Sequence, residues 1–81
     1  MTDSEVISLI QKALAEVAPK RAAEFSNINL ETTIESLGLD SIATMEMVGS
    51  LEDQVNATFP DEDLTEVSTL GDLAKLIRSN S

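Results

Sequence analysis

Apolar residues recur at steps of three and four positions in three stretches of this chain, and no stretch alternates apolar and polar residues long enough to form a strand. This spacing is typical of amphipathic helices, so the sequence predicts an all-α fold. The first stretch predicts a helix from about Ser4 to Ala18, because a Thr2-x-x-Glu5 capping box precedes it and Pro19 ends it. Its apolar positions are Val6, Ile10, Ala13, Leu14 and Val17.

The second helix has the clearest pattern. Asp40 and Ser41 are expected to begin it, and it should run to about Asn56. Its inward stripe consists of Met47, Val48, Leu51 and Val55.

The C-terminal third of the chain predicts two more elements. An acidic turn or short helix is expected at residues 61–64, after Pro60. Ser68 or Thr69 then caps a last helix. The inward residues of that helix are Leu70, Leu73, Ala74 and Ile77.

Between the first two helices lies a long connection, from Lys20 to Asp40. A connection of this length in a small domain usually has a function, and the segment 21–25 is expected to add a helical turn. Apolar side chains can hold the connection on the core: Phe25, Ile28, Leu30, Ile34 and Leu37.

The chain of 81 residues is long enough for one small domain, over residues 1–81, and too short to enclose a deep enzyme cleft. We therefore expect a monomeric bundle of three main helices plus one short helix, with a long loop between the first two. No repeat or linker-like segment is visible, which favours a free-standing protein over a domain cut from a longer synthase.

The net charge of −10 is unevenly distributed, because residues 22–74 contain acids but no Lys or Arg. Such a segment should repel nucleic acid and attract basic protein surfaces, although acids also simply keep a small domain in solution. The chain has no Cys and no His, which removes the usual nucleophile, general base and metal ligands. The acids also lack the spacing of a calcium loop, so neither a catalytic residue nor a metal site is expected.

No apolar run approaches the length of about 18 residues that a membrane span requires, and the first residues do not form a signal peptide. We therefore expect a cytoplasmic protein without membrane insertion.

The segment LGLDSI, residues 37–42, places a serine at the start of the second helix. Backbone N–H groups and the helix dipole make that position favourable for an anion such as a phosphate on Ser41. Gly38 allows a positive φ in the preceding loop, and Asp40 can cap the helix or offer an oxygen to a Mg²⁺ ion. The plainer alternative is that Asp40 and Ser41 only begin a helix.

LGLDSI resembles the G-x-D-S-[LI] motif of the acyl carrier protein family, and the resemblance extends over nearly the whole chain, including F-P-D-E-D at residues 59–63 and T-L-G-D-L-A at residues 69–74. The resemblance implies that a phosphopantetheinyl transferase moves 4′-phosphopantetheine from coenzyme A onto Ser41. It further implies that the thiol of this arm carries acyl groups as thioesters. Ser41 would then be an anchor, and the chemistry would belong to partner enzymes.

One face of the second helix is separate from its inward stripe and follows the serine. It comprises Ile42, Met45, Glu46, Gly49, Glu52 and Asp53. The resemblance implies that loading, condensing and tailoring enzymes dock here through basic patches, with the acids setting the register. A merely solvated acidic face is the alternative.

Three residues depart from the pattern of fatty-acid-synthesis carriers, which often have an acid at position 43, a larger apolar residue at 49 and Leu at 42. Ala43, Gly49 and Ile42 favour a polyketide, lipopeptide or other specialised pathway. A peptidyl or aminoacyl carrier is disfavoured by Gly38-Leu39, where such carriers more often have Gly-Gly. An acidic adaptor in which Ser41 is only a cap or a phosphorylation site is a further alternative.

Overall fold

The computed structural model describes residues 2–80, which form four α-helices and two short 3₁₀ helices. In chain order these are α1 (Asp3–Val17), η1 (Pro19–Phe25), η2 (Glu35–Leu37), α2 (Ser41–Val55), α3 (Asp61–Leu64) and α4 (Leu70–Asn80). Within these residues, the only β pairing is an isolated antiparallel bridge between Thr33 and Thr69. The predicted all-α fold is therefore confirmed. Met1 and Ser81, the ends of the predicted domain, lie outside the described residues.

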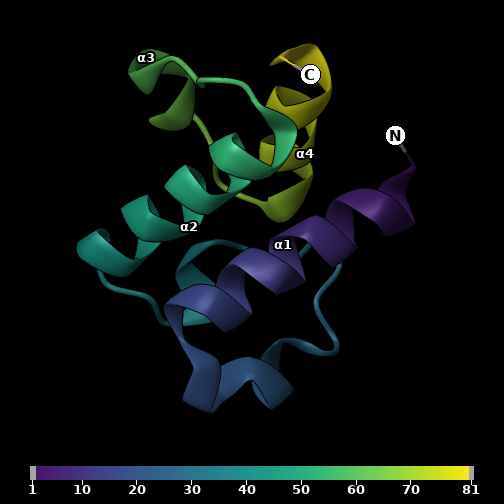
Figure 1. The fold of residues 1–81 in the computed structure, drawn as a ribbon, viewed down its shortest axis with the longest axis vertical. Helices are drawn as coiled ribbons and strands as arrows, with labels where there is room; N and C mark the ends of the chain where they lie inside the picture. The colour runs from purple at the N-terminus through teal and green to yellow at the C-terminus, as the bar shows by residue number, and fades with distance from the viewer. Residues whose placement is uncertain (1, 81) are drawn as a thin grey trace.

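The helices enclose one apolar core. α1 and α2 run side by side in opposite directions, α4 contacts α1 and stands at the upper right of the view, next to the C-terminal end of α2, and α3 sits at the edge of the bundle (Figure 1). The largest fully buried side chains come from α1, α2 and α4: Val6, Ile10, Leu14, Met47, Leu51, Leu70, Leu73 and Ile77. None of the described helices is both long and apolar enough to cross a lipid bilayer.

The predicted capping box begins α1. The Thr2 hydroxyl accepts a hydrogen bond from the Glu5 N–H at 3.1 Å, and the Glu5 carboxylate accepts one from the Thr2 N–H at 3.0 Å. The bond that the carboxylate accepts from the Thr2 N–H holds the pKa of Glu5 below its usual value. α1 starts at Asp3 and ends at Val17, one residue earlier at each end than predicted.

A second capping arrangement begins α4. The Thr69 hydroxyl accepts from the Asp72 N–H at 3.1 Å, while the Asp72 carboxylate accepts from the N–H groups of Ser68 and Thr69 at 3.0 and 3.1 Å. The backbone bonds from Thr69 and Ser68 lower the pKa of Asp72. Of the two predicted cap residues, Thr69 is therefore the one whose side chain caps α4.

The long connection has more regular structure than the sequence indicated. The predicted turn is a 3₁₀ helix that begins at Pro19, and a second one, η2, precedes α2. Phe25 and Leu37 are buried, and Ile28, Leu30 and Ile34 pack against the core, as predicted. The start of α4 fixes the connection further, because the N–H groups of Leu70 and Gly71 donate to the carbonyls of Thr32 and Leu30, both at 2.8 Å.

Candidate functional site

Ser41 is the first residue of α2, and its side chain is exposed. Asp40 is the N-cap, as predicted, and its carboxylate accepts from the Ala43 N–H at 2.7 Å. The Asp40 carbonyl accepts from both the N–H and the hydroxyl of Thr44, at 2.9 and 2.8 Å. No hydrogen bond within residues 2–80 engages the Ser41 hydroxyl, so it is available to an enzyme that approaches from solvent.

The loop before Ser41 turns at Gly38, which has φ +69° and ψ +26°. This left-handed conformation strains residues that have a Cβ, which explains the glycine and confirms the positive φ expected there. On either side of it, Leu37 is buried and Leu39 packs against the core. The loop is therefore fixed to the body of the protein while Ser41 projects from it.

Arg21 also holds this loop. Its Nη2 donates to the Leu37 carbonyl at 2.7 Å, and its Nη1 to the Gly38 carbonyl at 3.4 Å. The sequence pattern did not indicate that Arg21 is part of the site. The contact joins residues 16 and 17 positions apart, and no local pattern predicts such a pairing.

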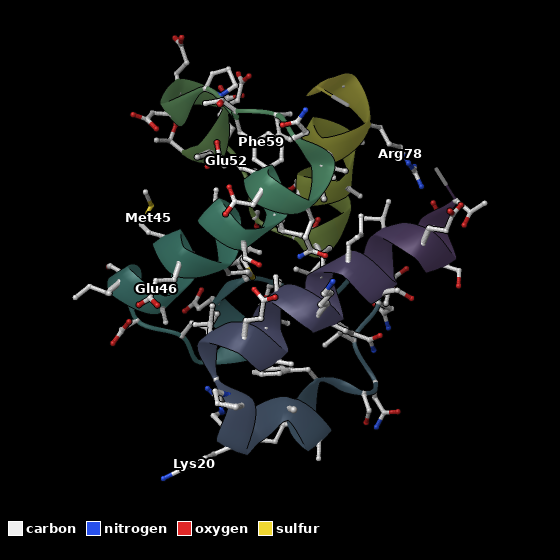
Figure 2. All side chains as sticks on the ribbon, in the orientation of Figure 1. Lys20, Met45, Glu46, Glu52, Phe59 and Arg78 are labelled. Atoms are coloured by element: carbon white, nitrogen blue, oxygen red, sulfur yellow. The ribbon has the colours of Figure 1, made fainter. Side chains whose placement is uncertain are left out.

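The six predicted docking residues lie on one side of α2. Helical geometry places them within about 120° of one another around the axis. Ile42 and Met45 are 72% and 60% exposed, which is unusual for large apolar side chains. Glu46 and Asp53 are exposed, whereas Gly49 and Glu52 are half-buried. Met45 and Glu46 extend from α2 toward solvent in Figure 2.

Glu52 has a structural role that the sequence did not reveal. Its carboxylate accepts a hydrogen bond from the N–H of Phe59 at 2.7 Å, and the Phe59 ring is buried. Figure 2 shows the two residues close together. Because a half-buried N–H without a partner is costly, Glu52 stabilises the segment that leaves α2.

A small cavity of about 130 Å³ opens beside the exposed face of α2, at Met45. It lies between α2, α3, α4 and the end of the connection, and its lining is mostly apolar: Ile34, Thr44, Met45, Met47, Val48, Leu64, Val67 and Leu73. Such a lining suits a small apolar group rather than a charged one. Within the described part of the chain, no group of three or more carboxylates is arranged to hold a metal ion.

Comparison with protein families agrees with this geometry. The family model described as a phosphopantetheine attachment site matches residues 5–77, which span everything from the first turn of α1 to the last turns of α4. This class of domain carries a 4′-phosphopantetheine prosthetic group. An exposed, unengaged serine hydroxyl at a helix N-terminus fits such a group, because the first-turn N–H groups can stabilise its phosphate.

Comparison with individual proteins narrows the class. The chain is 36% identical over 80 residues to an acyl carrier protein of Exiguobacterium sp., and 34% identical over 80 residues to that of Exiguobacterium sibiricum, with 98% of each chain covered in both cases. An acyl carrier protein homolog of Ureaplasma parvum is 39% identical over 54 residues, covering 67% of this chain and 68% of its own. The chain belongs to the acyl carrier protein family, and it is a non-catalytic carrier.

Proposed function

We propose that Ser41 is the residue that carries the 4′-phosphopantetheine arm. The supporting observation is the position of its hydroxyl, exposed at the first residue of α2 and not engaged by the described part of the protein. When attached, the arm supplies a terminal thiol that holds acyl groups as thioesters. Ser41 itself does not react during turnover in this proposal, because it only anchors the arm.

The residues around Ser41 have separate roles in this proposal. Gly38 turns the chain so that the loop can present the serine, and Asp40 fixes the first turn of α2 through Ala43. The N–H groups of that first turn stabilise the phosphate that joins the arm to Ser41. Asp40 is also an anion next to this phosphate, so a Mg²⁺ ion brought by the transferase would relieve their repulsion and could take a carboxylate oxygen as a ligand.

The exposed face of α2 is the proposed docking surface for partner enzymes. The phosphopantetheinyl transferase and the loading, condensing and tailoring enzymes would present basic patches to Glu46, Glu52 and Asp53, and apolar groups to Ile42 and Met45. The combination of two highly exposed apolar side chains with flanking carboxylates supports this role. Gly49 lies between them and offers a place where a partner can approach the helix backbone.

We also propose that this carrier serves a specialised biosynthetic pathway. Family membership is compatible with fatty-acid, polyketide or lipopeptide-type biosynthesis. Ile42, Ala43 and Gly49 favour one of the specialised pathways, because they differ from the residues that fatty-acid-synthesis carriers often have there. The cytoplasmic location and the monomeric state are predictions from the sequence.

Intact-mass measurement tests the proposal directly. After incubation with coenzyme A, Mg²⁺ and a broad-specificity phosphopantetheinyl transferase, the wild-type protein should gain one phosphopantetheine group. Ser41→Ala should fold normally and gain none. Ser8→Ala is the matched control, because Ser8 is an exposed serine on α1, away from the loop, and this variant should be modified like the wild type. Modification of Ser41→Ala, or an unmodified wild type, would show that the proposed anchor is wrong.

A further inference from the structure

Arg21 connects the first 3₁₀ helix to the loop that presents Ser41. Its guanidinium donates to two consecutive carbonyls, those of Leu37 at 2.7 Å and Gly38 at 3.4 Å. These residues form the end of η2 and the turn that follows it. The last carbonyls of a helix accept no hydrogen bond within the helix. The guanidinium has several N–H groups in a planar fork, so it can donate to two such carbonyls at once.

The guanidinium is held in position from its other sides. Its Nε lies 3.2 Å from a Glu24 carboxylate oxygen, and its central carbon lies 5.2 Å from the centre of the Phe25 ring. The Phe25 ring is buried, so it is a fixed platform for the cation. The Phe25 carbonyl in turn accepts from the Gln11 side chain at 3.1 Å, which ties η1 to α1. Arg21 therefore links the loop to the packed unit that α1 and η1 form.

The distance along the chain from this contact to Ser41 is short. Only Leu39 and Asp40 separate Gly38 from the serine. Gly38 is also the residue with the greatest conformational freedom in the loop, and its positive φ is one of several states open to it. A Cβ at Gly38 would lie 3.3 Å from Arg21 Nη2, so the guanidinium packs directly against the turn. Arg21 thus holds the turn at Gly38 itself, in addition to the anchoring of the loop by Leu37 and Leu39.

We propose that Arg21 is a positioning residue for the modification of Ser41, because its forked contact holds the 37–40 loop in the conformation that the transferase accepts. This inference rests on the proposed function of Ser41. In the transfer, the Ser41 oxygen bonds to the pantetheine phosphate, and the pyrophosphate bond to the departing adenosine 3′,5′-bisphosphate breaks. The serine proton passes to a base on the transferase. Arg21 takes no part in these steps and acts through the loop.

Removal of Arg21 should lower the fraction of carrier whose loop is ready for the transferase. When only a fraction of the carrier is in the binding-competent state, the apparent dissociation constant equals the intrinsic one divided by that fraction. The KM for the carrier should therefore rise while kcat stays unchanged. Loss of both donors in Arg21→Ala should raise this KM about tenfold. A purely stabilising residue would lower the unfolding temperature but leave KM unaltered at a temperature where the variant is folded.

The neighbouring cation provides the matched control. Lys20 is exposed and points away from the domain in Figure 2, so Lys20→Ala removes the same charge without touching the loop. The three proteins are compared by steady-state modification with coenzyme A and Mg²⁺ at saturation, and by thermal unfolding. Lys20→Ala should keep the wild-type KM. Equal KM values for Arg21→Ala and Lys20→Ala would overturn the proposal, as would a fall in kcat at constant KM.

Arg21→Lys separates the forked contact from the charge. A single ammonium keeps the charge and the aliphatic stem but cannot reproduce the planar fork, so this variant should show a smaller rise in KM of the same kind, about threefold. If Arg21→Lys has the wild-type KM, the positive charge alone is sufficient and the positioning role is wrong. If Arg21→Ala fails to fold, the KM of Arg21→Lys alone decides between these two outcomes. An unmodified wild type would instead refute the assignment of Ser41, so the two failures are distinguishable.

Discussion

At the scale of single residues, acids of equal charge do different things in this protein. Glu5 completes the capping box of α1, Glu52 accepts from the Phe59 N–H, and Glu16 accepts from the Ser50 hydroxyl at 2.6 Å across the α1–α2 contact. Replacing any of these three would change the stability of the fold as well as the charge. The proposed docking face of α2 is therefore best tested with exposed acids that lack such bonds, some on that face and some away from it.

We predict that Glu46→Lys slows modification by the transferase far more than Glu31→Lys does. Glu46 is exposed on the α2 face that carries Ile42 and Met45, whereas Glu31 is exposed on the long connection near the start of α1. Both changes alter the net charge equally. At low ionic strength, Glu46→Lys should reduce kcat/KM about tenfold through slower association. Initial rates measured over a range of salt concentrations check this.

Salt dependence provides the internal control for this comparison. Because the Debye length is about 10 Å at 0.1 M salt and shortens further above that, the defect of Glu46→Lys should shrink as salt is added. Circular dichroism must show both variants folded. Equal defects in the two variants would mean that only net charge matters and that this face of α2 has no special role.

At the scale of the elements, α2 contains a glycine that its own packing does not require. A Cβ at Gly49 would meet no atom within 4 Å, and its φ is not positive. Glycine inside a helix costs about 0.5–1 kcal/mol relative to alanine. The other helical glycine is different, since a Cβ at Gly71 would lie 2.9 Å from the Leu30 carbonyl oxygen. The two positions form a matched pair.

We predict that Gly49→Ala raises the unfolding temperature by roughly 2–8 °C, the shift that about 0.5–1 kcal/mol produces in a domain of this size. Gly71→Ala should lower it, because the new methyl group would collide with backbone that α4 itself binds. Thermal unfolding followed by circular dichroism measures both. A lower unfolding temperature for Gly49→Ala would contradict this account of α2.

The Gly49→Ala variant also tests stability and docking separately. If a partner approaches the helix backbone at Gly49, the more stable Gly49→Ala variant should be modified more slowly than the wild type. Unchanged modification would mean that the glycine is merely tolerated. The unfolding temperature and the modification rate are both measured on Gly49→Ala against the wild type, so no second variant is needed.

The elements that the sequence predicted well are those whose signals are local. The helix starts at Thr2, Asp40 and Thr69 depend on bonds to residues three positions ahead, and the apolar spacing of each main helix identified its buried face. The contacts that the sequence did not reveal join residues across a loop, such as Arg21 with Leu37, 16 positions apart, and Glu52 with Phe59, seven positions apart. Pairings of this kind depend on how the loops fold back, and no periodic pattern encodes them.

At the scale of the whole molecule, the charge is poorly compensated. The described residues form two ion pairs, between Arg21 and Glu24 and between Arg78 and Asp3. Arg78 reaches the start of α1 in Figure 2, so this pair joins the two ends of the described chain. Both pairs are partly exposed, and such pairs contribute little to stability. Most of the 15 acids therefore repel one another in the folded state.

We predict that added NaCl raises the unfolding temperature at neutral pH, because screening weakens this repulsion more than it weakens two exposed ion pairs. A gain of about 1 kcal/mol would raise the unfolding temperature by roughly 4–8 °C. Chloride is preferred to sulfate, since sulfate also strengthens apolar burial. As a control, Glu62→Gln with Glu66→Gln removes two exposed acids from the α3 region, and this variant should start from a higher unfolding temperature and respond less to salt. A flat or falling response of the wild type would mean that the acids are compensated locally.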